Sequence, residues 1–201
     1  MARVMRKSAI WTGLLAAMAL PVGLAATSPF LAYRDAAHAA AGFSGVAALA
    51  MLLPQALLIA GLLPLSRHAA QMLHRSTGAA IAALVGLHVA GLWITSPQDM
   101  ADALLFRAPT LFSVWGVLAL GLLIAIALSA LLRRRFAPGS WRYVHGLLAA
   151  FLVTASLAHA LPIIGTMEQA TKAALCLMIA VATVAALIRR LGARRRRPDR
   201  G

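Results

Sequence analysis

The sequence predicts an all-α membrane protein, a six-transmembrane-helix bundle with both termini in the cytoplasm. Three observations carry this prediction: the apolar content, six long apolar runs, and the charge of the connections between them. Of the 201 residues, 62% are hydrophobic and 12% are charged, whereas a soluble domain is nearer half apolar and about a quarter charged. The chain therefore has too few polar side chains to cover a water-facing surface, and its excess apolar residues must face lipid.

Six apolar runs are long enough to cross a bilayer, since a spanning helix needs about 20 apolar residues. They cover residues 8–26, 39–63, 74–94, 111–132, 141–161 and 170–188. Short connections join them, so we expect one domain over residues 1–201. The longest connection, 95–110, has room for a short interfacial helix around 99–106.

The first run also resembles a signal peptide, because it has a basic start and small residues near its end. Its apolar stretch is long for a signal core, so we expect a retained helix. Cleavage would leave five spans in the same orientation.

Charge sets the orientation of the spans. Basic residues lie before the first run, between the second and third, between the fourth and fifth, and after the sixth, whereas four of the five acidic residues lie in the alternate connections. The bases include Arg3, Arg6, Lys7, Arg67, Arg133, Arg134, Arg135, Arg189 and Arg190, and the acids are Asp35, Asp99, Asp102 and Glu168. The positive-inside rule therefore predicts that both termini of this multi-pass protein are cytoplasmic. The Ala- and Arg-rich composition is typical of bacteria, so we expect the bacterial inner membrane.

The net charge of +14 comes from these flanks, whose basic residues suit anionic lipid headgroups. A nucleic-acid-binding protein would need a soluble basic face, which no stretch of this chain can form.

Two pairs of histidines lie inside the predicted spans at the same spacing. His74 and His88 are 14 residues apart on the third span, and His145 and His159 are 14 apart on the fifth. In an α-helix, 14 residues rise about 21 Å and return to within about 40° of the same face. Each helix therefore presents two imidazoles on one side, one near each membrane surface.

The third and fifth spans run in the same direction, so the pairs match in depth. His74 is level with His145 on the cytoplasmic side, and His88 with His159 on the outer side. Facing helices would form two bis-imidazole clamps, each suited to one six-coordinate b-type haem iron. A single intramembrane histidine is often only an interhelical hydrogen-bond partner, but two matched pairs argue against that interpretation for all four.

Other metal chemistry fits less well. Zinc or copper would need further carboxylate or thiolate ligands at each level. Cys176 is the only cysteine, which excludes a disulfide framework and a cysteine-ligated iron–sulfur cluster. We predict no catalytic residue.

Neighbouring residues fit a haem site as well as they fit plain packing. Gly78 lies one turn beyond His74 and would leave room for a porphyrin. Arg75 and Arg142 flank the cytoplasmic pair and could bind haem propionates. Ser156 could orient His159 as a hydrogen-bond partner.

These residues resemble the ferric reductase-like transmembrane domain family, which includes the membrane part of NADPH oxidases. The resemblance rests on His74–Arg75 followed by Gly78 and His88, on Trp141 with His145 and His159, and on six spans with histidines on the third and fifth. It covers the chain from about residue 39 onward. It implies that the four histidines are axial ligands of two b haems that pass electrons to an acceptor outside the cell.

The haem-binding membrane subunit of methionine-sulfoxide reductase systems is a similar relative of the same size. Like that subunit, this chain shows no flavin- or nucleotide-binding domain, so we expect the membrane subunit of an oxidoreductase. Its electrons would come from a cytoplasmic flavoprotein, with flavin only in that partner, or from quinol. The acceptor is not predicted.

Two alternatives stay open from the residues alone. The chain could be a non-redox membrane protein, such as a small transporter or assembly factor with structural histidines. It could also be an intramembrane enzyme acting alone, although no paired aspartates or His-Glu-x-x-His motif supports that.

Overall fold

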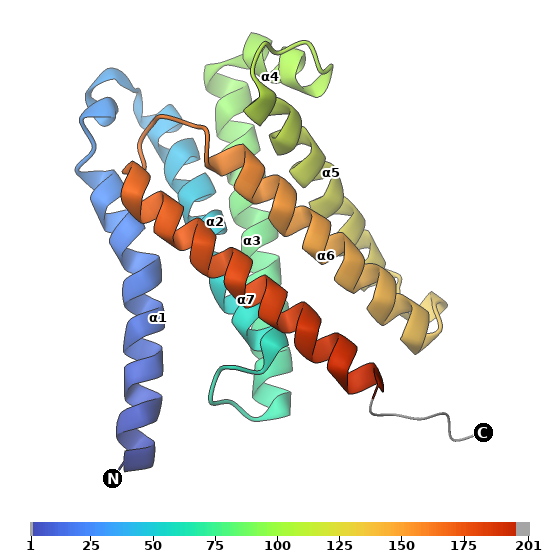
Figure 1. Ribbon diagram of the computed structural model, residues 1–201. Helices are drawn as coiled ribbons and strands as arrows, with labels where there is room; N and C mark the ends of the chain where they lie inside the picture. Colours follow the sequence, from blue (N-terminus) through green and yellow to red (C-terminus); the bar gives the residue numbers. More distant parts are fainter. Residues whose placement is uncertain (1, 196–201) are drawn as a thin grey trace.

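The computed structural model describes residues 2–195, and its regular structure over that range is helical (Figure 1). The elements in chain order are α1 (Ala2–Ala26), η1 (Pro29–Tyr33), α2 (Ala36–Ala60), α3 (Arg67–Thr95), α4 (Pro97–Leu104), α5 (Leu111–Leu131), η2 (Arg133–Arg135), α6 (Pro138–Ala160) and α7 (Gln169–Arg195). The end of the basic tail, 196–201, lies outside the described residues.

Six of the seven α-helices in the described range, all but the short α4, are long and apolar enough to cross a membrane. They coincide with the six predicted runs, so the all-helical six-span architecture is confirmed. The short helix expected around 99–106 is present as α4, which Pro97 opens at a position where its missing N–H costs nothing.

The start of α3 differs from the prediction, which placed the span at 74–94. The helix begins at Arg67, because the Ser66 hydroxyl caps it by accepting the Ala69 N–H at 3.2 Å. His68 therefore lies in the first turn of α3 rather than in a connection. His74 lies two turns inside the helix, held by regular structure on both sides.

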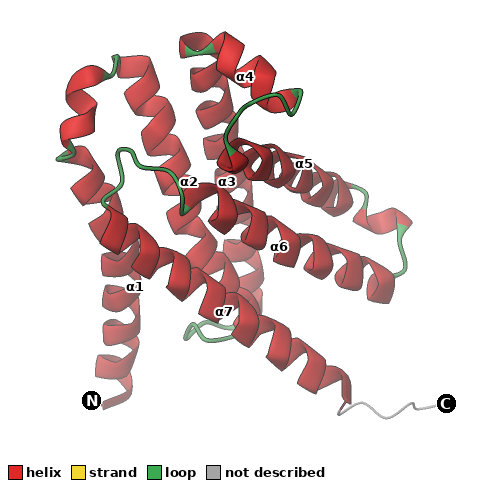
Figure 2. Cartoon of the chain, turned by 45° about the horizontal axis from the view of Figure 1, so that its top comes forward, coloured by secondary structure: helices red, strands yellow, loops and turns green. Residues whose placement is uncertain are grey.

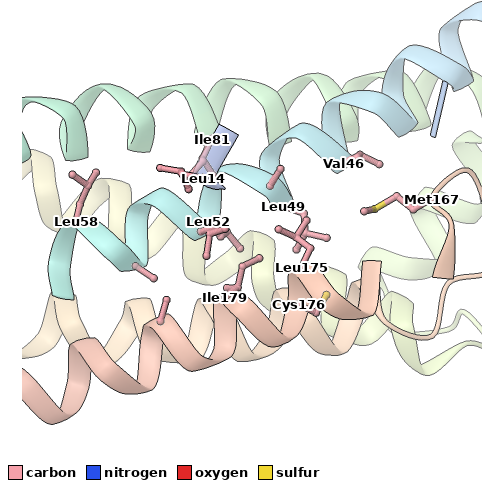
Figure 3. Close-up of a cluster of buried hydrophobic side chains, with 14 of the residues drawn as sticks. Leu14, Val46, Leu49, Leu52, Leu58, Ile81, Met167, Leu175, Cys176 and Ile179 are labelled. Atoms are coloured by element: carbon pink, nitrogen blue, oxygen red, sulfur yellow. The ribbon is translucent and has the colours of Figure 1, made fainter. Parts of the chain in front are cut away.

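Helix α2 is the centre of the bundle and packs against α1, α3 and α7. Leu49, Leu52 and Leu53 of α2 are buried together with Leu175 and Ile179 of α7 in the main apolar core (Figure 3). A helix that is apolar on every side is stable only when neighbours or lipid surround it, and α2 is surrounded chiefly by protein.

Helices α5 and α6 form a second unit that packs mainly within itself and lies beside α3 and α7 (Figures 1 and 2). No residue of α5 is buried, and Ala155 is the buried residue of α6. The long helices of both units run between two ends of the bundle. One end carries the N-terminus and the α2–α3 and α5–α6 connections, and we call it the basic end. The other carries the four acidic residues named above and is the acidic end.

Candidate functional site: two histidine pairs

Of the four predicted histidines, two lie on α3 and two on α6, and all are partly buried. At the basic end, the ring centroids of His74 and His145 are 6.4 Å apart, with ring planes inclined at 75°. At the acidic end, His88 and His159 lie close enough to interact electrostatically. The fold therefore brings a histidine of α3 against a histidine of α6 at the basic end, and the His88–His159 pairing at the acidic end stays a prediction.

The acidic-end pair is held by backbone carbonyls of the neighbouring helices. The Nδ1 of His88 lies 2.8 Å from the carbonyl oxygen of Ala41 on α2. The Nδ1 of His159 lies 2.8 Å from the carbonyl oxygen of Phe112 on α5. A carbonyl can only accept, so Nδ1 carries the proton and donates in both rings, leaving the Nε2 lone pair available. The partner of His159 is thus Phe112, not the expected Ser156.

A glycine lies beneath each acidic-end ring. A Cβ on Gly45 of α2 would come within 2.8 Å of the His88 Nδ1, and a Cβ on Gly116 of α5 within 2.8 Å of the His159 Nδ1. Carbon and nitrogen atoms do not approach this closely without a hydrogen bond, so any side chain here would displace the ring. The missing side chains let each imidazole reach the backbone carbonyl one turn away.

The two units repeat this arrangement at a constant offset in sequence. His74, His88, Ala41 and Gly45 of the α2–α3 pair correspond to His145, His159, Phe112 and Gly116 of the α5–α6 pair, each 71 positions later. Neither the two glycines nor the two carbonyls were predicted from the sequence. The available signal was the spacing of 43 residues between Gly45 and His88, which recurs between Gly116 and His159.

At the basic end, His145 has side-chain partners instead. Its Nδ1 lies 3.2 Å from the Ser129 hydroxyl of α5, which donates its own proton to the Ile126 carbonyl at 2.8 Å. The hydroxyl oxygen therefore accepts from His145, whose Nε2 again stays free. Trp141 covers the ring at a centroid distance of 5.0 Å and donates its indole N–H to the Ser129 carbonyl at 2.8 Å.

His74 is the exception among the four. Its Nδ1 is buried and has no hydrogen-bond partner within the described part of the chain. The residue is linked to α2 through its backbone instead, since the amide nitrogen of Gln55 donates to the His74 carbonyl at 3.1 Å. Gly78, expected beside a porphyrin, lies against this amide: its Cβ would stand 3.0 Å from the Gln55 Nε2.

Arginines gather near the basic-end pair. Arg75 and Arg142 are exposed, and Arg75 lies within electrostatic range of His74. Sequence analysis missed Arg190 of α7, which donates to the Arg142 carbonyl at 2.6 Å and lies within electrostatic range of His145. The available signal was only a terminal basic run, which also fits a plain topogenic flank.

The basic-end pair has the spacing needed to hold a metal between two imidazoles. Imidazole nitrogens bind first-row metals at roughly 2.0 Å, so two rings on opposite sides of one metal have centroids roughly 6 Å apart. The 6.4 Å separation of His74 and His145 fits this requirement. If a haem binds here, His74 and His145 would be the two residues that hold its iron.

The family comparison agrees with this geometry. The model of the ferric reductase like transmembrane component matches residues 42–156, a range that includes His74, His88 and His145 and ends three residues before His159. No curated protein and no solved structure matches the chain significantly. The matched range covers more than half of the protein, and the chain belongs to the ferric reductase-like transmembrane component family, which implies a membrane component that transfers electrons on haem.

Proposed function

We propose that the chain binds two b haems, one between His74 and His145 and one between His88 and His159, and conducts electrons across the membrane between them. The observation that carries this proposal is the fixed tautomer of three of the four histidines. His88, His145 and His159 each donate Nδ1–H to an oxygen and keep Nε2 free. This is the arrangement that metal-ligating histidines use.

Each residue around the pairs has a part in this proposal. The carbonyls of Ala41 and Phe112 would orient the acidic-end rings, and the hydroxyl of Ser129 would orient His145. Arg75 and Arg142 would bind propionate carboxylates at the basic end, because guanidinium groups pair well with carboxylates. Bound haem would supply reversible one-electron transfer, and the protein would supply ligation and exclusion of water.

The charge distribution supports an orientation with the basic end in the cytoplasm. Electrons would enter there from a cytoplasmic flavoprotein, or from quinol in the membrane, and leave at the acidic end to an acceptor outside. The exposed arginines of η2 (Arg133–Arg135) offer positive charge at the entry side. They suit an anionic donor surface, because opposite charges speed diffusional encounter.

The test is a dithionite-reduced minus oxidised absorption spectrum of the detergent-purified protein, with haem measured as pyridine haemochrome. We expect low-spin b-type bands and about two haems per chain. One haem would reduce the proposal to a single pair. A folded, helical protein that binds none after reconstitution with haem would refute it and leave the histidines as packing groups.

A further inference from the structure

The basic-end pair contains one unexplained feature, the buried Nδ1 of His74. The other three histidines place Nδ1 against an oxygen acceptor, whereas this nitrogen has no partner among the described residues. A buried polar atom without a partner costs free energy, so native proteins rarely leave one unexplained.

A second buried atom without a partner lies on the residue that already contacts His74. The Gln55 side chain of α2 donates its amide N–H to the His74 carbonyl at 3.1 Å, and its Oε1 is buried with no partner in the described chain. These two atoms are the buried side-chain polar atoms of the described residues that lack a partner. They belong to two residues that contact each other between α2 and α3.

The two atoms are chemically complementary when His74 ligates a metal. A neutral imidazole that binds through Nε2 carries its proton on Nδ1, which is then a donor. An amide oxygen can only accept. A hydrogen bond from Nδ1 to Oε1, formed by rotation of the Gln55 side chain or of the ring, would satisfy both atoms.

The sequence makes room for this amide. Gly78 of α3 faces Gln55, and a Cβ there would stand 3.0 Å from Nε2, closer than ordinary packing allows. Gln55 also lies in an otherwise apolar stretch of α2 between Pro54 and Ala56, both buried. An amide inside a membrane helix is costly unless it is hydrogen-bonded, and His74 is the residue it contacts.

We propose that Gln55 is the positioning residue of His74, its side-chain oxygen accepting the Nδ1–H when the ring ligates the basic-end haem. This inference rests on the proposed function. Gln55 would thereby do for His74 what the Ala41 and Phe112 carbonyls do for the acidic-end rings. It would also tune the haem, because an acceptor on Nδ1 makes the imidazole a stronger electron donor to iron.

The test compares Gln55→Leu and Gln55→Glu in the full-length, haem-loaded protein by potentiometric titration and by electron paramagnetic resonance of the ferric form. The basic-end haem is identified as the component lost in His145→Ala. Leucine removes the acceptor, so the midpoint potential of that haem should rise. We expect a tenfold change in the ferrous-to-ferric ratio at a given potential, which corresponds to roughly 59 mV. Glutamate keeps a stronger acceptor, so the midpoint should fall. Resonances of the same haem should shift in both variants.

Thr154→Val is the matched control. It also removes a polar atom from a membrane helix, but Thr154 bonds only the Ala150 carbonyl of its own helix α6 and should leave both haems unchanged. Selective loss of the basic-end haem in Gln55→Leu, with retention in Gln55→Glu, would also support the inference.

Unchanged resonances and midpoints in both variants of a two-haem protein would overturn the inference while leaving the proposed function intact. A shift in the glutamate variant alone would be a charge effect, and loss of the haem in both variants would be a packing effect. Either outcome overturns it as well. Absence of haem from the wild-type protein would instead be a failure of the proposed function.

Discussion

The two histidine pairs share their helices and their spacing in sequence, yet the fold holds them differently. At the acidic end, His88 and His159 both donate to backbone carbonyls at 2.8 Å across a glycine. At the basic end, His145 donates to the Ser129 hydroxyl at 3.2 Å, and the His74 Nδ1 has no partner in the described chain.

The difference shows that a regular spacing of histidines in the sequence does not determine which groups orient their rings. A backbone carbonyl is present at every position, so the acidic end needs only a glycine to expose it. The basic end relies on particular side chains, which evolution can exchange one at a time. We therefore expect the acidic-end geometry to be rigid and the basic-end geometry to be open to tuning.

The largest expected effect comes from removing the proposed haem ligands. His88→Ala or His159→Ala should lose the acidic-end haem, and His74→Ala or His145→Ala the basic-end haem, each lowering haem content by about half. Pyridine haemochrome and resolved ferric resonances measure this. His68→Ala, on the exposed first turn of α3, is the control and should keep both haems. Full haem content in all four variants would contradict the pairing.

The next effect tests the glycines at the acidic end. Gly45→Ala or Gly116→Ala places a methyl group within 2.8 Å of a ring nitrogen, so the ring must leave its carbonyl acceptor. Loss of such a partner should weaken acidic-end haem binding by roughly 10–100-fold, measured by haem titration of the apoprotein.

The matched controls for these variants are Gly86→Ala on α3 and Gly121→Ala on α5, because a Cβ at either position meets nothing within 4 Å. Both should bind haem normally and gain slightly in helix stability. Equal behaviour of all four alanine variants would mean that the rings do not depend on contact with the glycines.

A third effect separates the two haems by reduction potential. Two short bonds to carbonyls make the acidic-end imidazoles stronger donors, which stabilises ferric iron. The arginines near the basic end favour the less positive ferrous form. We expect the midpoint potential of the acidic-end haem to lie at least roughly 59 mV below that of the basic-end haem, which corresponds to a tenfold difference in the ferrous-to-ferric ratio. The histidine variants identify which midpoint potential belongs to which haem. A single midpoint potential, or a higher potential for the acidic-end haem, would contradict this expectation.

The smallest effect concerns Ser129. Ser129→Ala removes the hydroxyl that accepts from His145 but keeps the backbone carbonyl that binds the Trp141 indole. A long hydrogen bond to a hydroxyl contributes about 1 kcal/mol. The midpoint potential of the basic-end haem should therefore rise by an amount that changes the ferrous-to-ferric ratio less than tenfold, while haem content stays unchanged. Ser76→Ala is the control, because the Ser76 hydroxyl donates to the Leu73 carbonyl of its own helix. A shift in the midpoint potential of the acidic-end haem in Ser129→Ala would contradict the assignment of Ser129 to the basic-end haem.

Much of the fold could be predicted because membrane spans depend on local composition. The six spans followed from apolar length, and the helix α4 from the length of the connection 95–110. The start of α3 was missed because Arg67 and His68 lower the hydropathy of its first turn, although Ser66 is a good N-cap.

The candidate site was predictable only in part. The four histidines stand out because ionisable groups are rare in membrane helices. Gly45, Gly116, Gln55 and Arg190 did not, since small or isolated residues acquire meaning only when another helix lies against them. Those contacts depend on tertiary packing, which hydropathy does not encode.

The sparse packing of α5 and α6 has a consequence for assembly. No residue of α5 is buried, and α6 buries only Ala155. The apolar contact of this hairpin with the core is made by partly buried residues such as Leu123 and Leu157. Bound as proposed, each haem would be held by one histidine of α3 and one of α6, and would therefore link the α5–α6 hairpin to the other helices. In the newly inserted chain, the α5–α6 hairpin could then lie apart from α3 until two haems bind between the helices, and pack against α3 once they are bound. Cofactor loading would thus be the last step in building the protein.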